Sequence, residues 1–194
     1  MSRLQRVCIN CGSSPGLLPA YMENASLLGR HLAEQKIEVV FGGADVGLMG
    51  AVADAALACG GRVIGVIPES IAAKVGHRGL TELHVVASMH ERKQMMFDLS
   101  DAFVGLPGGI GTLEEVLEVL TWAQLGFHGK PCGLLNVAGY FDHLLRFLDR
   151  STEHRFVRPE HRSMLLVANE PTALLNQFRE YAPSIVEKWI DRKP

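Results

Sequence analysis

Short apolar runs alternate with longer stretches of helical periodicity along almost the whole of this 194-residue chain. The apolar runs predict strands over Arg6–Asn10, Glu38–Phe41, Val63–Ile67, Leu83–Val86, Ala102–Leu106 and Cys132–Asn136. The stretches around them predict helices over Leu18–Gln35, Gly47–Cys59, Met89–Ser100, Gly111–Leu125, Gly139–Arg150 and Pro171–Tyr181. Continuous apolar strands between helices are typical of parallel sheets that are covered on both faces. We therefore expect the α/β class, with a mainly parallel sheet in a single doubly wound, Rossmann-like domain over residues 1–194.

Composition and charge narrow the possible partners. Apolar residues make up 47% and charged residues 21% of the chain, as in ordinary globular proteins. The net charge is −2 and basic residues form no run, so neither nucleic acid nor an anionic membrane is an expected partner. The apolar runs are too short to span a bilayer, and the first ten residues lack the apolar core of a signal peptide. We expect a cytoplasmic protein.

The cysteines and histidines do not predict a metal or a cofactor. Cys8-x-x-Cys11 has the spacing of redox and metal motifs, but Cys8 falls within the first predicted strand and Cys11 would face the other side of the sheet. A second such motif is missing, and the eight histidines are scattered, with His90 and His128 interpreted as ordinary surface or supporting residues. Buried, reduced thiols are the favoured interpretation.

Three turns rich in small residues follow the first, second and fifth predicted strands, at residues 11–16, 42–50 and 107–112. In doubly wound folds, ligands bind beyond the carboxyl ends of the strands, so these turns are expected to share one rim. Together they suit a ligand the size of a nucleotide. None of them carries the glycine pattern of dinucleotide-binding proteins or of ATP-hydrolysing P-loops, which removes the usual support for those functions.

The turn at Pro107–Thr112 passes directly into a helical pattern. Glycine-rich turns that open a helix bind phosphate through bare backbone N–H groups and the helix dipole. The same residues permit a plainer interpretation, because Thr112 and Glu115 have the spacing of a capping box that serves only the helix. Both interpretations fit this segment alone.

A second signal lies in the helix before the fifth strand. Met89, Arg92, Lys93 and Met96 fall on one helical face, which mixes two cations with two methionines. At the wall of a cleft, the arginine would bind phosphate, a hydroxyl or a base edge, and a methionine would pack on a base. Alternatively, both cations lie on an ordinary solvent-exposed face.

Both signals together resemble the signature of the LONELY GUY family, namely Met89-x-x-Arg92-Lys93 followed by Pro107-Gly-Gly-x-Gly-Thr-x-x-Glu115. The resemblance extends to residues 42–50, 121–126 and 130–136, and so covers most of the chain from Val7 to about Leu166. Members are cytokinin riboside 5′-monophosphate phosphoribohydrolases, and many were once labelled lysine decarboxylases. Nothing in this sequence identifies the Schiff-base lysine or cofactor site of a pyridoxal enzyme.

The resemblance implies hydrolysis of the N-glycosidic bond of N6-modified adenosine 5′-monophosphates, with plain AMP as a further substrate. The products would be the free base and ribose 5-phosphate. It also implies a homodimer with sites near the subunit interface, where Trp122, Leu125 and Phe127 are candidate contacts, although core packing explains these three residues equally well. By motif match, Arg92 and Glu115 are the expected catalytic pair. The expected substrate-binding residues are Gly43, Met89, Lys93, Gly108, Gly109, Ile110, Gly111, Thr112 and Thr121.

Two other functions stay open at this level, a non-catalytic nucleotide or molybdenum-cofactor carrier and a structural dimer module whose glycines serve packing. The joint presence of Arg92 and Glu115 favours the hydrolase, since a carrier does not require both. The longest irregular stretch, Pro68–Glu82, is either an active-site loop or a solvated connection. It carries Lys74 and Val75 where family members often have an acidic residue.

Overall fold

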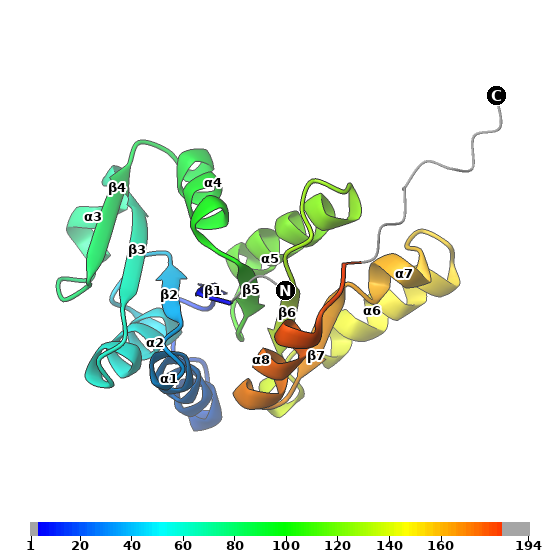
Figure 1. Ribbon diagram of the computed structural model, residues 1–194, viewed down its shortest axis with the longest axis horizontal. Helices are drawn as coiled ribbons and strands as arrows, with labels where there is room; N and C mark the ends of the chain where they lie inside the picture. The colour runs from blue at the N-terminus through cyan, green and yellow to red at the C-terminus, as the bar shows by residue number, and fades with distance from the viewer. Residues whose placement is uncertain (1–3, 184–194) are drawn as a thin grey trace.

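The computed structural model describes residues 4–183, and these residues build one seven-stranded sheet (Figure 1). Every neighbouring pair of strands runs parallel, as the sequence predicts. Across the sheet the strand order is β4-β3-β2-β1-β5-β6-β7. The strands are β1 (Arg6–Asn10), β2 (Glu38–Phe41), β3 (Val63–Pro68), β4 (Glu82–Val86), β5 (Ala102–Gly105), β6 (Cys132–Leu135) and β7 (Leu165–Ala168).

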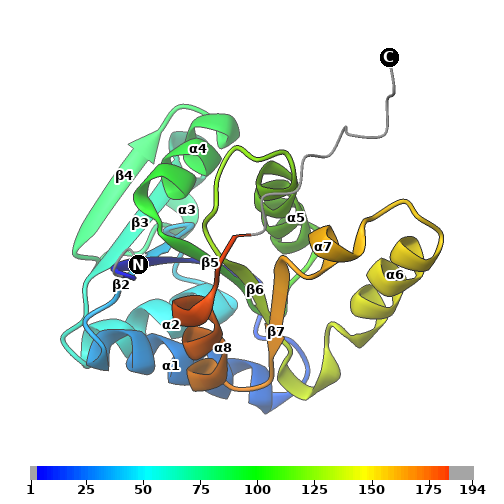
Figure 2. The same cartoon turned by 45° about the vertical axis from the view of Figure 1, so that its right-hand side comes forward.

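Helices connect the strands and cover both faces of the sheet, as Figure 2 shows from a second side. They are α1 (Pro19–Glu34), α2 (Gly47–Ala58), α3 (Glu69–Val75), α4 (Met89–Leu99), α5 (Ile110–Gln124), the 3-10 turn η1 (Val137–Gly139), α6 (Asp142–Glu153), α7 (Pro159–Arg162) and α8 (Pro171–Glu180). Among residues 4–183, no helix has both the length and the apolar composition that crossing a bilayer requires.

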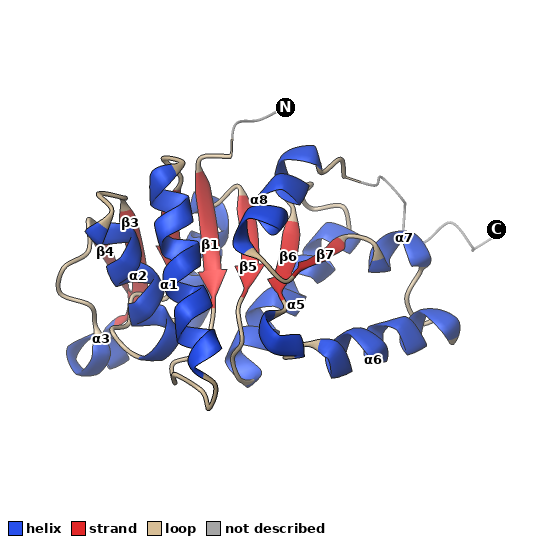
Figure 3. Cartoon of the chain, turned by 90° about the horizontal axis from the view of Figure 1, so that it is seen from below, coloured by secondary structure: helices blue, strands red, loops and turns tan. Residues whose placement is uncertain are grey.

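The core consists of two apolar layers, one on each face of the sheet. The first layer joins α1, α2 and α8 to residues such as Val7 and Ile9 of β1. The second joins α4 and α5 to Cys8 and Phe103, and residues of α6 pack against it. Alternate residues of β1 thus enter opposite layers, which is the period of two that a strand imposes. Figure 3 shows α1 on the near side of the strands, seen from below.

The two central strands define the place where the chain changes direction across the sheet. β1 pairs with β2 on one side and with β5 on the other, with Val7 opposite both Val39 and Ala102. From β1 the chain proceeds outward through β2, β3 and β4, and then returns to β5 beside β1. The carboxyl ends of β1 and β5 therefore flank a topological switch point, which is where open α/β sheets bind their ligands.

The structure corrects the predicted elements in several places. The stretch Pro68–Glu82 is not irregular throughout, because Glu69–Val75 forms α3. A seventh strand, Leu165–Ala168, pairs with β6 at the edge of the sheet and was not predicted. Helix α6 begins at Asp142 instead of Gly139, because Ala138 and Gly139 have left-handed backbone angles, with φ of 51° and 71°, that a helix cannot continue.

Candidate active site

The three small-residue turns meet at the switch point, as expected from the sequence. The Gly12 N–H donates to the Pro107 carbonyl oxygen at 3.0 Å, and the Leu48 N–H donates to the Gly12 carbonyl oxygen at 3.0 Å. A Cβ on Gly108 would lie 2.8 Å from the Gly12 nitrogen and still nearer to the Thr112 side chain. Glycine at position 108 is therefore what allows the first and third turns to touch.

The third turn opens α5 without a side-chain cap. The helix begins at Ile110 with Gly109 as its N-cap residue, and no side chain bonds to its first N–H groups. The capping-box interpretation of Thr112 and Glu115 is therefore wrong, since Glu115 bonds to Arg92 instead of the start of the helix. Ile110 is 87% exposed, and a Cβ on Gly109 or Gly111 would meet nothing within 4 Å. This end of α5 is open to an anion.

Arg92 is buried between the sheet and α5, so its interpretation as an ordinary surface residue is wrong. Only 8% of it is exposed. Its Nε donates to the carbonyl oxygen of Val66 in β3 at 3.1 Å, and its Nη1 donates to Glu115 Oε1 at 2.6 Å. The expected catalytic pair is thus one hydrogen-bonded ion pair, formed by residues 23 positions apart in the sequence.

The surroundings of this ion pair favour protonation of the Glu115 carboxyl. Burial raises the pKa of Glu115 above its ordinary value, and the neighbouring Arg92 guanidinium opposes that rise without cancelling it. A carboxyl with a raised pKa beside a fixed cation, at the ligand-binding edge of a sheet, is typical of functional sites.

Lys93 links α4 to α5 through two ion pairs. Its Nζ forms ion pairs with Glu114 and, at 2.9 Å, with Glu118. The hydrogen bond to Glu114 is the main reason that the pKa of Lys93 lies above its ordinary value. On the same face of α4, Met96 is buried in the core and Met89 is 48% exposed. The four residues of this face therefore have different environments. Met96 lies in the core, Arg92 and Lys93 form ion pairs, and Met89 is exposed to solvent.

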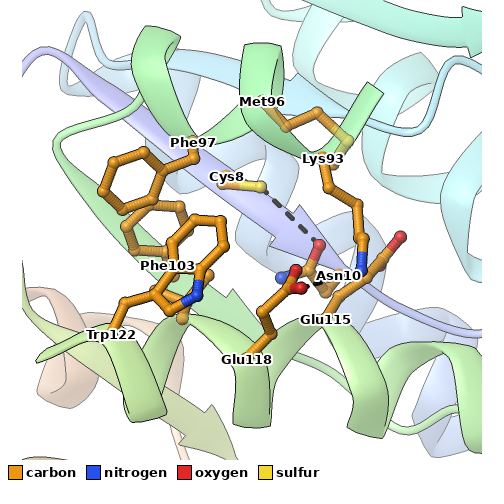
Figure 4. Close-up of a pocket in the computed structure, with 10 residues that line it drawn as sticks. Cys8, Asn10, Lys93, Met96, Phe97, Phe103, Glu115, Glu118 and Trp122 are labelled. Atoms are coloured by element: carbon orange, nitrogen blue, oxygen red, sulfur yellow. Dashed lines mark hydrogen bonds and ion pairs between the residues drawn. The ribbon is translucent and has the colours of Figure 1, made fainter. Parts of the chain in front are cut away.

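A cavity of about 20 Å³ lies behind Glu115 and has the size of one water molecule (Figure 4). The Asn10 side chain and the Glu115 carboxylate both line it, and the rings of Phe97, Phe103 and Trp122 form its apolar side. The Cys8 Sγ lies 3.6 Å from Asn10 Oδ1. Burial raises the pKa of the Cys8 thiol, which fits an inert thiol and not a redox centre.

The sequence did not reveal the role of Gly42, whose lack of a side chain leaves room for the Arg92 guanidinium. A Cβ on Gly42 would lie 2.2 Å from Arg92 Nη2 and 2.6 Å from the Met49 Cε. Gly43, the expected binding residue, has a φ of +74°, and a Cβ there would lie 3.1 Å from the Ile67 Cβ and 3.3 Å from the Val66 nitrogen of β3. The glycine pair after β2 was a signal for both positions, but only the burial of the guanidinium reveals the role of Gly42.

Thr121 lies outside the group that the structure brings together. It is exposed on α5, and its hydroxyl donates to the Leu117 carbonyl oxygen at 2.6 Å. It lies six positions after Glu115 on the helix, which corresponds to about 9 Å along the axis.

The structure also brings together one His-carboxylate group that the sequence did not suggest. Ligand atoms of Asp45, Asp54 and His77 lie within 4.8 Å of one another. The Gly79 N–H donates to His77 Nδ1 at 3.1 Å, so in neutral His77 the proton is on Nε2, which faces Asp54 Oδ1 at 3.0 Å. With its proton there, Nε2 has no lone pair for a metal, and the group is a hydrogen-bonded link between α2 and the segment after α3.

Fold and site together define a Rossmann-like α/β protein with a glycine-rich ligand site at its switch point. A family model described as "Possible lysine decarboxylase" matches residues 49–178. The chain is 50% identical over 183 residues to a probable cytokinin riboside 5′-monophosphate phosphoribohydrolase, LOGL9, from Oryza sativa subsp. japonica, which covers 94% of this chain and 81% of the relative. The chain belongs to the LONELY GUY family of cytokinin riboside 5′-monophosphate phosphoribohydrolases.

Further relatives come from a plant and a bacterium. The cytokinin riboside 5′-monophosphate phosphoribohydrolase LOG7 of Arabidopsis thaliana is 46% identical over 96% of this chain and 86% of its own length. The enzyme of that name from Rhodococcoides fascians is 49% identical over 84% of both chains. Among solved structures, the molybdenum cofactor binding protein of Rippkaea orientalis superposes with a TM-score of 0.70 at 20% identity, covering 93% of this chain and 98% of its own. That likeness shows the shared fold.

Proposed function

We propose that this chain hydrolyses the N-glycosidic bond of N6-modified adenosine 5′-monophosphates, and of AMP, to free base and ribose 5-phosphate. Relatives that carry this activity in their names are 46–50% identical over 94–96% of the chain. The observation that carries the proposal is the buried Arg92–Glu115 pair, with 2.6 Å between Nη1 and Oε1, next to the uncapped start of α5.

Substrate binding starts from the phosphate in this proposal. The turn at residues 108–112 binds it through backbone N–H groups at the start of α5, where the helix dipole favours an anion. Glu115 stands on the second turn of that helix and reaches the ribose of a nucleotide held there. Lys93 adds positive charge, which its partners Glu114 and Glu118 partly balance.

The proposed roles of Glu115 and Arg92 follow from the charges that develop as the glycosidic bond breaks. As the bond between C1′ and N9 breaks, its electron pair passes to the base and C1′ gains positive charge. The Glu115 carboxylate stabilises that charge or orients the attacking water, whose oxygen forms the new bond to C1′. Arg92, fixed by Val66 and Glu115, favours the flow of electrons into the base. One proton of the water is released and the base takes up one, so the reaction is a net hydrolysis.

The proposal includes the protein's context. We propose that residues 1–194 act as one domain, that the protein acts in the cytoplasm, and that it forms a homodimer. Phe127 is 73% exposed beside α5, which supports an apolar contact there, whereas Trp122 packs edge-on against Phe97 at 5.0 Å. Light scattering coupled to size-exclusion chromatography tests the dimer, and a purely monomeric mass would contradict it.

Chromatography of incubations with isopentenyladenosine 5′-monophosphate and with AMP tests the reaction. We expect free base and ribose 5-phosphate in equal amounts. If folded protein releases no base from either nucleotide but binds them, the proposal is wrong and the protein is a nucleotide carrier. If it neither cleaves nor binds them, the glycine turns serve packing alone.

A further inference from the structure

A cavity of about 310 Å³ opens at the switch point, between the first and third turns. Residues 12–16 and 107–109 line it, together with Leu48 and the two aromatic residues Tyr21 and Tyr140. The two rings meet edge to face, with 5.6 Å between their centroids. The turn on which the proposed function places the phosphate is part of this cavity, but neither tyrosine is among the expected site residues.

Tyr140 makes one specific polar contact in this cavity. Its hydroxyl donates to the carbonyl oxygen of Gly108 at 2.6 Å, across 32 positions of sequence. The residue is 40% exposed, so packing in the core does not explain its place. The hydroxyl therefore lies against the phosphate turn while one side of the ring faces the solvent.

The backbone before Tyr140 is built to hold the ring in this place. Ala138 has a left-handed φ of 51°, which is strained for a residue with a side chain. The Asn136 side chain fixes the turn by accepting from the Phe141 N–H at 2.7 Å and donating to Asp142 Oδ1 at 2.8 Å. Phe141, the next residue along, is anchored in the core with 2% exposed. Strain that the surroundings enforce in this way is typical of ligand-holding segments.

We propose that Tyr140 is a positioning residue for the phosphate group of the substrate. The Tyr140 hydroxyl donates to the Gly108 carbonyl oxygen and so holds the peptide that joins Gly108 to Gly109. Because a trans peptide is planar, holding the Gly108 carbonyl also fixes the direction of the Gly109 N–H, one of the groups on which anion binding depends.

This inference rests on the proposed function, and Tyr140→Phe tests it, since the change keeps the ring and removes only the hydroxyl. Tyr181→Phe is the matched control, because Tyr181 lies near Ile37 and Pro131 at the opposite, amino-terminal end of the strands. Calorimetric titration with ribose 5-phosphate reports phosphate binding without any turnover. We expect Tyr140→Phe to bind about tenfold more weakly than the native chain, as the loss of one hydrogen bond to a carbonyl predicts. Tyr181→Phe should bind like the native chain.

Kinetics separate a role in phosphate positioning from a merely structural one. We expect Tyr140→Phe to raise KM for AMP about tenfold with kcat within twofold. Ribose 5-phosphate binding within twofold of native, or a native chain that does not bind it, would overturn the inference. A fall in kcat with an unchanged KM for AMP would also overturn it. A native chain that binds ribose 5-phosphate but cleaves nothing would refute the proposed function alone.

Discussion

A methyl group at position 42 would occupy space that the Arg92 guanidinium fills. The Cβ of Gly42→Ala would lie 2.2 Å from Arg92 Nη2, so this nitrogen must move by about 1.3 Å to reach an ordinary van der Waals separation. Because the guanidinium is rigid, such a shift also displaces Nη1, which donates to Glu115 at 2.6 Å, and Nε, which donates to the Val66 carbonyl oxygen at 3.1 Å. We expect at least one of them to break.

The expected loss is one of activity much more than of stability. A misplacement of about 1 Å in a catalytic group costs on the order of 10²-fold in rate, and we expect that fall in kcat/KM. The two atoms nearest the new methyl group, Arg92 Nη2 and Met49 Cε, are ends of flexible side chains. The free energy of unfolding should therefore fall by only about 1–3 kcal/mol, as is usual for overpacking.

Steady-state release of free base measures the effect, and urea unfolding of the same preparations measures the stability. Gly79→Ala is the matched control, since its Cβ would come no nearer than 3.6 Å to the His77 ring. We expect native-like kcat/KM for the control. A folded Gly42→Ala variant with kcat/KM within threefold of native would refute the idea that the guanidinium must sit where Gly42 allows it.

Other consequences follow from the pKa of Glu115 and from the core. Since burial raises that pKa, kcat/KM should fall on the acid side with a midpoint above pH 4.5, and a midpoint at or below 4.5 would contradict the raised pKa of Glu115. The pKa of Glu115 is higher in the folded protein than in the unfolded chain. Its contribution to the free energy of unfolding should therefore decrease as the pH rises from the unfolded-chain pKa through the folded-protein pKa. Urea unfolding of the native chain and of Glu115→Gln from pH 4 to 8 measures the difference. Leu174→Ala, at a fully buried position of α8, should cost about 2–5 kcal/mol and leave KM unchanged, and a urea-measured loss below about 1 kcal/mol would contradict the packing described.

The sheet was predictable because its strands carry local signals. β1 and β2 have the predicted bounds, and the apolar run at β5 differs by one residue at its end. α3 was missed because none of its residues is buried, so no apolar period marks it. β7 has only four residues and follows the single turn of α7, which leaves too short a pattern to recognise.

The site was predictable only in part, because its chemistry depends on contacts between distant residues. The glycine turns lie at the ends of predicted strands, so parallel topology alone brings them together. The partner of Glu115 was not visible locally, and Thr112-x-x-Glu115 fits a capping box until Arg92 is placed beside the carboxylate. Gly42 and Tyr140 likewise gain their roles from neighbours 50 and 32 positions away, Arg92 and Gly108.

The most direct test of the account compares the native chain with Glu115→Gln on isopentenyladenosine 5′-monophosphate. The glutamine keeps an acceptor for Arg92 but loses the charge, and Glu153→Gln, at an exposed position near the end of α6, is the matched control. Chromatography should show base and ribose 5-phosphate from the native chain and the control, with a rate about 10²–10⁴-fold lower for Glu115→Gln. Equal rates from all three would contradict a catalytic Glu115.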